Sequence, residues 1–392
     1  MKIAEWTQKL KKNYLFQSVA EKVKSFKEKN PYANIINMGI GDVSLPICKS
    51  VVNSCIKSAN EMGNIESFRG YSPNSGYDFL KKSIQQDYQD RNISLDLDEI
   101  FISDGAKSDM SNILDIFSSD NVCLIPDPVY PVYLDTSIMN GMTVKFINAT
   151  EDNNFLPLPD LSVKSDIIYI CSPNNPTGAS YSKPELKLWV DYALSCDAVI
   201  LFDAAYESFI EDDSCKSIFE VENSDLCAIE FKSFSKSSGF TGMRCGYSIV
   251  PKKLKRNGES LNSLWSRRHS TKFNGVPYII QRAAEACLST EGKKECSKFI
   301  KYYKENSKSI SKTLDNLGIK YFGGKNSPYI WMKCINDMNS WEFFDYLLEK
   351  FQIVGTPGSG FGKNGEGFFR LSCFGSHENT LEACKRLENM KK

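Results

Sequence analysis

A lysine flanked by hydroxyl groups and glycines, with an arginine eight residues later, is the first candidate for chemistry in this sequence. Lys236 lies in the segment 233–244, which begins at Ser233 and ends at Arg244. A lysine amine that is partly unprotonated condenses with an aldehyde to give an imine. Arg244 can hold a phosphate ester as a charged fork, and Ser233 can donate a neutral hydrogen bond to it. The segment predicts a site for a phosphorylated aldehyde, although a lysine in a surface loop rich in serine and glycine would look the same.

Short runs of β-branched residues alternate with helical stretches through the middle of the chain. This alternation predicts a mostly parallel sheet with helices on both faces. Ligands bind beyond the carboxyl ends of the strands in such a sheet, so the residues that follow each strand matter most. The predicted strands are residues 100–103, 122–125, 144–147, 167–171, 198–202, 228–231 and 246–250.

The ends of four further strands carry residues that complement a phosphorylated aromatic aldehyde. Ala106 lies where a helix should begin, and the free N–H groups of a helix start favour a phosphate. Tyr130 can stack on a planar ring, and Asn175 can donate to an oxygen on that ring. Asp203 ends an apolar strand, and a buried carboxylate needs a partner, which a protonated ring nitrogen supplies. Together with Tyr206 for the phenolic oxygen, these residues predict a site for pyridoxal 5′-phosphate.

Each of these features taken alone also has a structural interpretation. A turn between strand and helix or a packed aromatic residue is common in any sheet of this kind, and only the agreement of five strand ends favours one cofactor. A protonated pyridine ring withdraws electrons from a substrate carbanion, and Lys236, as a free amine, would remove the Cα proton.

Composition argues against several other classes of protein. The chain has 392 residues, of which 41% are hydrophobic, and its 48 Lys and Arg balance 48 Asp and Glu. This neutrality disfavours a nucleic-acid partner. The 13 cysteines form no C-x-x-C pair and there are only two histidines, which predicts neither a metal site nor a disulfide framework nor a hydrolase triad. No apolar run reaches the roughly 18 residues of a membrane span, so we expect a cytoplasmic protein without a membrane partner.

The chain resembles the LL-diaminopimelate aminotransferase family, including its chlamydial members, over essentially its whole length. That family is a branch of the fold-type I aminotransferases. The general aminotransferase pattern is carried by residues 175–178, Asp203 with Tyr206, 233–236, Arg244 and 369–372. The narrower family pattern is carried by residues 14–16, 39–42, 69–71, 103–107, 127–133, 202–206, 273–275 and 356–362.

The resemblance implies a role for each matching residue. Lys236 would be the catalytic residue and would bind the cofactor covalently. Arg370 would clamp the substrate α-carboxylate in a bidentate pair. Because Tyr71 and Asn274 would come from a partner subunit, a homodimer with shared active sites is implied. The other implied cofactor contacts are Ala106, Lys107, Tyr130, Asn175, Asp203, Tyr206, Ser233 and Arg244. The other implied substrate contacts are Tyr14, Gly41, Lys107, Tyr130, Asn175 and Asn274.

The implied activity is amino transfer between LL-2,6-diaminopimelate and 2-oxoglutarate, which yields tetrahydrodipicolinate and glutamate and serves lysine or peptidoglycan precursor biosynthesis. The sequence departs from the family at Asn74, where the family usually has an acidic residue placed to meet the distal ammonium group of the substrate. This favours, as an alternative, an aminotransferase of lysine, aspartate or an aromatic amino acid. A second alternative is a regulator that binds pyridoxal phosphate without catalysis, but such proteins usually carry a DNA-binding extension.

The expected architecture is α/β, a fold-type I transferase with a large domain and a small α+β domain. The large domain would contain a mostly parallel seven-stranded sheet, and the small domain would close over the substrate and bring Arg370 to it. The expected divisions are residues 1–46 for the N-terminal arm and part of the small domain, 47–285 for the large cofactor-binding domain and 286–392 for the small domain. Helices are expected at 13–30, 77–91, 186–194, 276–288, 300–317, 341–351 and 381–390, and further strands at 329–332 and 368–372.

Overall fold

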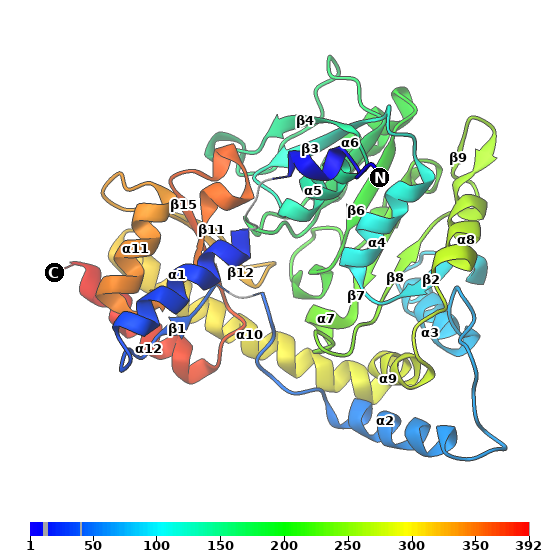
Figure 1. Cartoon of the computed structure of the whole chain (residues 1–392), viewed down its shortest axis with the longest axis horizontal. Coiled ribbons are helices and arrows are strands. Elements are labelled where there is room, and N and C mark those ends of the chain that lie inside the picture. The colour runs from blue at the N-terminus through cyan, green and yellow to red at the C-terminus, as the bar shows by residue number, and fades with distance from the viewer. Residues whose placement is uncertain (11–14, 40, 392) are drawn as a thin grey trace.

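The computed structural model describes residues 1–10, 15–39 and 41–391, and Figure 1 shows a large and a small sheet with a long helix running beneath both. The large sheet has seven strands in the order β2-β8-β7-β6-β5-β3-β4. Strand β8 is antiparallel to both neighbours and the other pairs are parallel, which confirms the mostly parallel sheet predicted from sequence. In sheet order, the strands are Ile100–Ser103, Gly246–Ile249, Ala228–Ser233, Val199–Asp203, Ile167–Cys171, Val122–Asp127 and Thr143–Asn148.

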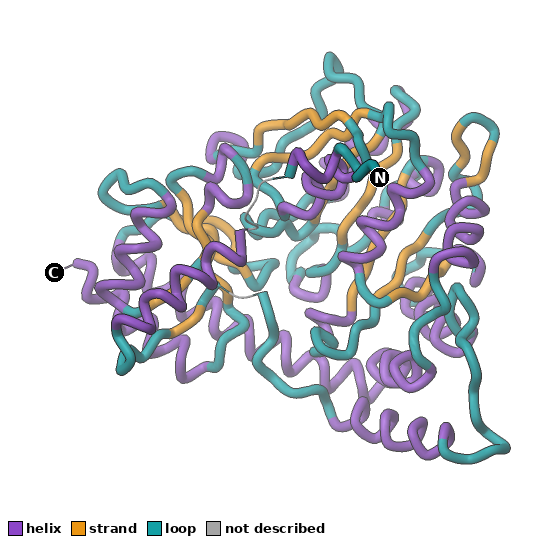
Figure 2. The backbone as a smooth tube through the Cα atoms, in the orientation of Figure 1, coloured by secondary structure: helices purple, strands orange, loops and turns teal. Residues whose placement is uncertain are grey.

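The central strands of this sheet are apolar because helices cover both of their faces. Successive residues of β5 point to opposite faces, so Ile168 and Ile170 pack with Trp189 of the helix α6, whereas Tyr169 packs with Met110 of α4. Figure 2 shows this layering of helices around the strands. The helices of this part are α2 (Lys49–Met62), α3 (Asp78–Gln89), α4 (Ala106–Asn112), α5 (Pro131–Met139), α6 (Lys183–Ser195), α7 (Phe234–Ser237), α8 (Leu261–Lys272) and α9 (Tyr278–Leu288).

The small sheet is antiparallel, with the order β11-β12-β15-β14. A segment near the N-terminus joins this part, because β1 (Ile36–Asn37) pairs in parallel with β13 (Ile353–Val354). The four strands are Tyr321–Gly323, Tyr329–Lys333, Phe368–Ser372 and Thr356–Pro357 in sheet order. The helices around it are α1 (Leu15–Lys29), α10 (Thr290–Leu317), α11 (Ser340–Phe351) and α12 (His377–Glu388), and β9 (Lys255–Arg256) and β10 (Glu259–Ser260) form a separate hairpin.

The 28-residue helix α10 connects the two parts. Its first turns pack against α2 and α9, and other parts of it contact α12 and β12 (Figure 1). The division at residues 46 and 285 stays a prediction. Within the described residues, no helix is both long enough and apolar enough to cross a membrane.

Several helices escaped the sequence analysis because their buried faces are not marked by large apolar residues. Helix α2 buries only Val51 and Ser58, and the first ten residues of α10 bury only Gly292 and Cys296. The residues after β3 also form a helix, α5, which begins at Pro131 because proline is well tolerated in the first helical turn.

Candidate active site

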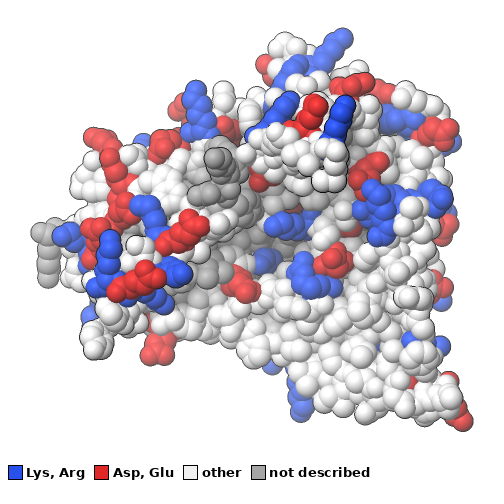
Figure 3. All heavy atoms as spheres, in the orientation of Figure 1, with Lys and Arg blue, Asp and Glu red and all other residues white. Residues whose placement is uncertain are grey.

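A cavity of about 1040 Å³ lies where the carboxyl ends of the central strands face the small sheet. Figure 3 shows charged side chains of both signs over the visible face and a hollow between the two parts of the molecule. Tyr14, one of the predicted substrate contacts, lies outside the described residues. The other predicted residues that line the cavity are Gly41, Ala106, Lys107, Tyr130, Asn175, Asp203, Tyr206, Ser233, Lys236, Arg244 and Arg370.

The reactive amine, Lys236, lies in the single turn of helix α7 that directly follows β7. Ser233 caps this turn, because its hydroxyl accepts a hydrogen bond of 3.1 Å from the backbone N–H of Ser235. The Lys236 ammonium donates to the carbonyl oxygen of Gly41. Burial lowers the pKa of Lys236 to about 8, against the opposing effect of Asp42. About a tenth of the amine is therefore unprotonated at pH 7, far more than for an ordinary lysine, as a nucleophile or a base requires.

The cradle for a phosphate is built by a close approach of β8 and Arg244 to the start of α4. A Cβ at Gly105, where φ is +135°, would lie 2.4 Å from Nη2 of Arg244. A Cβ at Gly246 would lie 3.0 Å from the backbone nitrogen of Ala106. Glycine at both positions thus lets the guanidinium and the N–H of the helix start face the same space. Arg244 donates to Ser235 Oγ at 3.3 Å and has no ion pair within the described part of the chain.

The buried carboxylate of Asp203 ends β6 on the same cavity. It accepts hydrogen bonds from the Tyr133 hydroxyl at 2.5 Å and from the Ala205 N–H at 3.0 Å. Burial raises the pKa of Asp203, and these two hydrogen bonds oppose the rise. No cation pairs with Asp203 among the residues that are described. A protonated ring nitrogen would supply that cation.

Sequence reasoning missed Tyr133, although it lies in the same motif as Tyr130. The two rings meet edge to face, with centroids 5.8 Å apart, and Tyr133 also stacks on Tyr169 at 5.0 Å. The spacing of three residues was the available signal, since Tyr130 directly precedes α5 and Tyr133 lies in its first turn. Tyr133 therefore positions Asp203 while Tyr130 lines the cavity beside it.

Arg370 is fully buried, with 1% of its surface exposed, on the opposite wall of the cavity. Its guanidinium donates to Asn175 Oδ1 at 2.6 Å and to the Gly39 carbonyl at 2.7 Å. Nε has no hydrogen-bond partner, and no carboxylate within the described ranges pairs with this arginine. A buried cation without an anion is costly, so the site is prepared for a carboxylate from outside the chain.

Tyr329 of β12 is a second residue that the sequence analysis did not single out. The centre of the Tyr329 ring lies 4.3 Å from the Arg370 guanidinium carbon, and the Tyr329 hydroxyl lies 2.8 Å from the Tyr206 hydroxyl. Burial raises the pKa of both tyrosines, so they stay neutral hydrogen-bonding groups. Only the position of the small sheet across the cavity from the large one brings this ring to the site, and the local sequence around Tyr329 gives no signal of it.

Two predicted cofactor and substrate residues, Tyr71 and Asn274, are not among those that line the cavity. Both are exposed, Tyr71 with 89% of its surface. Their loops lie side by side, because a Cβ at Gly275 would lie 2.7 Å from the Pro73 carbonyl and Ser72 Oγ donates to the Val276 carbonyl at 2.6 Å. The two side chains therefore belong to adjacent exposed loops outside the lining of the cavity of their own chain.

The residues of the cavity fit pyridoxal 5′-phosphate. Arg244 is a cation without a carboxylate partner, Asp203 is a carboxylate without a cation, and Lys236 is an amine with a lowered pKa, all within the described lining. A ring with a phosphate at one end and a basic nitrogen at the other would satisfy both charges and would present its aldehyde to the amine.

Comparison with known proteins agrees with this geometry. Residues 33–387 match the family of aminotransferase class I and II. The chain is 50% identical to the LL-diaminopimelate aminotransferase of Lachnospira eligens, over 97% of both chains, and 47% identical to that of Methanosphaera stadtmanae, over 100% of this chain and 99% of the relative. The solved L,L-diaminopimelate aminotransferase of Chlamydomonas reinhardtii is 40% identical, covers 100% of this chain and 99% of its own, and has a TM-score of 0.94.

More distant structures share the fold. A Thermus thermophilus aspartate aminotransferase variant superposes with a TM-score of 0.88 at 18% identity, over 99% of both chains. The fold-type I architecture and the pyridoxal-phosphate cofactor predicted from sequence are both confirmed. The chain belongs to the family of aminotransferase class I and II, together with the LL-diaminopimelate aminotransferases.

Proposed function

We propose that this enzyme moves an amino group between LL-2,6-diaminopimelate and 2-oxoglutarate, with tetrahydrodipicolinate, the cyclised keto product, and glutamate as the other pair. The observation that carries the proposal is the buried Arg370 guanidinium, which lacks a carboxylate partner among the described residues and lines the same cavity as Lys236. An α-carboxylate is common to all four compounds. The close relatives named for LL-diaminopimelate support the particular substrate.

The residues of the cavity divide the work of amino transfer. When bound, pyridoxal phosphate supplies the sink for the electron pair left at the substrate Cα. Asp203 would hold the ring nitrogen in its protonated form. Arg370 would bind the α-carboxylate and so orient the Cα–H bond toward Lys236. The Lys236 amine would take the Cα proton and return it elsewhere on the conjugated system, because its lowered pKa lets it hold and release a proton near neutrality.

Asn175 and Tyr206 would hold the phenolic oxygen of the ring, which connects cofactor binding to substrate binding. Asn175 accepts from Arg370 through Oδ1, so its amide N–H groups remain directed elsewhere, as a donor to that oxygen requires. Tyr206 is tied to Tyr329 by their hydroxyl groups at 2.8 Å. A substrate carboxylate that binds Arg370 would therefore change the position of Asn175, and with it the hydrogen bond to the cofactor ring.

A homodimer would complete the site. Tyr71 and Asn274 lie on one exposed surface, and a second copy of the chain would bring the partner subunit's Tyr71 to the phosphate and the partner subunit's Asn274 to the substrate. The cytoplasmic location and the large and small domain divisions stay predictions as well.

The direct test is product formation by the purified holoenzyme. With LL-diaminopimelate and 2-oxoglutarate, we expect stoichiometric formation of glutamate and tetrahydrodipicolinate. If neither forms while another amino acid donates its amino group to 2-oxoglutarate, the substrate assignment is wrong and the aminotransferase assignment stands.

Asn74 favours the alternative that the enzyme prefers another amino donor, such as lysine, aspartate or an aromatic amino acid. Asn74 is half-buried, in the same loop as Tyr71. Its backbone carbonyl oxygen lies 3.2 Å from His269 Nδ1. A carboxylate at this position would give a charge-assisted contact to a distal ammonium, about twice as strong as a neutral one. A donor screen on the unmodified enzyme decides between the substrates. Asn74→Glu should then lower the KM for LL-diaminopimelate, whereas Asn74→Gln, which keeps the amide, should not.

A further inference from the structure

A second cavity, of about 790 Å³, adjoins the active site and has no part in the proposed transamination. Ser233 lines both cavities, and the neighbouring Lys232 lines only the second. Its walls come from the end of α3, from the segment that follows β6, from β7 with α7, from the end of α9, and from residues 293–308 of α10. Seven basic and four acidic side chains line it, and two further carboxylates, Glu230 and Asp90, lie within 4.0 Å of Lys232 and Lys293, so basic groups exceed acidic ones by one. The basic ones are Arg91, Lys216, Lys232, Lys293, Lys301, Lys304 and Lys308, and the acidic ones are Asp87, Glu207, Glu211 and Glu305.

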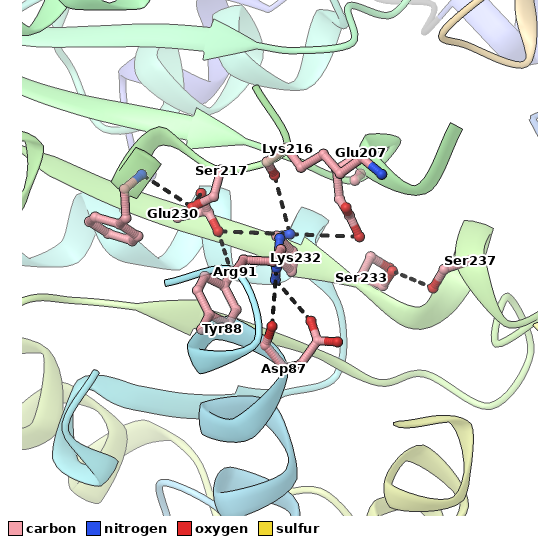
Figure 4. Close-up of polar contacts among 12 residues, drawn as sticks. Asp87, Tyr88, Arg91, Glu207, Lys216, Ser217, Glu230, Lys232, Ser233 and Ser237 are labelled. Atoms are coloured by element: carbon pink, nitrogen blue, oxygen red, sulfur yellow. Dashed lines mark hydrogen bonds and ion pairs between the residues drawn. The ribbon is translucent and has the colours of Figure 1, made fainter. Parts of the chain in front are cut away.

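Lys232 is a buried ammonium that is short of acceptors. Only 4% of its surface is exposed, and it donates to the Lys216 carbonyl at 3.3 Å. The nearest carboxylate oxygens belong to Glu207 at 3.6 Å and Glu230 at 4.0 Å (Figure 4). An ammonium has three N–H donors, so the described residues leave this one incompletely bound. Burial accordingly lowers the pKa of Lys232.

Glu230 does not make up this shortage, because its nearer oxygen lies 4.0 Å from the Lys232 nitrogen and other donors hold the carboxylate in place. One of its oxygens accepts from the Tyr88 hydroxyl, and the other accepts from Ser217 Oγ at 2.6 Å (Figure 4). That second oxygen also accepts from the Ile218 N–H at 2.9 Å. The Lys232 ammonium therefore has a neighbour of opposite charge but no short hydrogen bond to it.

Arg91 is a second cation of this cavity with an unused donor. Its Nη2 pairs with Asp87 at 2.8 Å, but its Nη1 is buried without a hydrogen-bond partner. The Tyr88 ring contacts both cations, with the Arg91 guanidinium carbon 4.4 Å and the Lys232 nitrogen 5.3 Å from its centre. One aromatic ring thus holds two incompletely bound cations at the cavity wall.

One face of α10 adds positive charge. Lys301, Lys304 and Lys308 follow each other at spacings of three and four residues, so they project from the same side of the helix. Lys304 is buried and pairs with Glu211 at 2.9 Å. Lys301 and Lys308 are exposed and form no ion pair with any described residue.

We propose that this cavity binds a small polyvalent oxyanion, whose oxygens accept from Lys232 and Arg91 and whose remaining charge is met by the α10 lysines. An oxyanion with two or three negative charges supplies the acceptors that Lys232 and Arg91 lack, and it also meets the charges of Lys301 and Lys308, which pair with no described carboxylate. Such a ligand would tie α10 to β7 and α7, and α7 carries Lys236. The proposal does not depend on which amino acid the active site uses.

The test uses the holoenzyme, in which the cofactor phosphate already occupies the Arg244 cradle. Titration calorimetry with inorganic pyrophosphate and, separately, with citrate distinguishes phosphate from carboxylate recognition. We expect saturable binding of at least one probe, one per chain, that weakens with added salt and persists in Arg370→Ala, which lacks the substrate clamp. Absence of saturable binding for both probes, or its loss in Arg370→Ala, overturns the proposal.

Variants then locate the binding. The double variant Lys301→Ala with Lys308→Ala changes two exposed residues and should weaken binding about tenfold. The matched control Lys312→Ala, an exposed lysine of the same helix outside the cavity, should leave it unchanged. Lys232→Met should abolish binding, and if that variant does not fold, Arg91→Gln replaces it. Binding that survives both the double variant and the buried-cation variant would place the anion elsewhere and contradict the proposal.

Discussion

The two cavities that meet at Ser233 differ in whether their charged side chains form ion pairs. In the active site, Arg244, Lys236 and Arg370 form no ion pairs with described residues, and Asp203 has no cation. In the second cavity, Arg91 and Lys304 each have a carboxylate within 3 Å. The active site leaves charges of both signs apart for ligands to connect, whereas the second cavity neutralises most of its charges internally and retains an excess of one sign.

This difference predicts which cavity gains more free energy when its ligands bind, namely the active site. Buried charges without partners destabilise the folded chain. A ligand that supplies the partners binds only the folded chain and not the unfolded one, and it therefore raises the free energy of unfolding. The active site should therefore depend strongly on its cofactor and substrate, and substitutions there should affect catalysis more than folding. Each of the following experiments removes one of the separated charges or changes how it is held.

The largest effect is expected from removing the reactive amine. Lys236→Ala should lower kcat by about 10⁴-fold or more, because the variant lacks both the nucleophile and the general base. Steady-state glutamate formation measures this, with circular dichroism to verify the fold. Amino transfer at an unchanged rate in this variant would remove Lys236 from the mechanism.

The next largest effect is expected at the ring nitrogen. Asp203→Asn keeps the shape of the side chain but removes its charge. Because the ring nitrogen then loses its charged partner, kcat should fall by about 100-fold or more. Tyr133→Phe is the matched comparison. It removes the 2.5 Å hydrogen bond that lowers the pKa of Asp203, so the acidic limb of the kcat profile should move to higher pH with a smaller loss of rate. Equal losses in both variants would contradict the separate role of the carboxylate.

Arg370→Lys should affect substrate binding more than the chemical step. A lysine cannot form the bidentate contact with a carboxylate, and a hydrogen bond to a charged group is worth about 1.5–3 kcal/mol. We expect kcat/KM to fall about 30-fold, mostly through a higher KM for both the amino acid and the oxo acid. A change for only one of the two would show that Arg370 does not hold the carboxylate they share.

The smallest effect concerns the stability of the cofactor-free chain. The pKa of Lys236 is lowered from 10.5 to about 8. Between these values the unfolded chain binds more protons at this lysine than the folded chain, so the free energy of unfolding should rise with pH, by at most about 1.4 kcal/mol per pH unit. Urea unfolding of the cofactor-free protein at pH 7 to 10 measures the slope. Lys236→Met should flatten it, and an equal slope in the variant would assign the effect to other groups.

Residues that follow strands were the part of the site accessible from sequence. Ala106, Asp203 and Ser233 come after short apolar runs, and parallel strands place their carboxyl ends at one edge of a sheet, so local patterns sufficed to bring them together. Tyr329 and Thr356, which line the same cavity, lie in strands of the small sheet. No local pattern states which residues of that sheet face the large one.

The amino-acid sequence by itself determined the strands of the large sheet, the chemistry of the strand ends and the cofactor they suit, because these depend on short-range periodicity and residue type. Only the tertiary structure decided that Tyr133 holds Asp203, that Arg370 is buried without a carboxylate among the described residues, and that Lys232 and Arg91 share a second cavity. Burial and charge pairing depend on contacts between segments far apart in the chain, and such contacts leave no mark on the sequence around either residue.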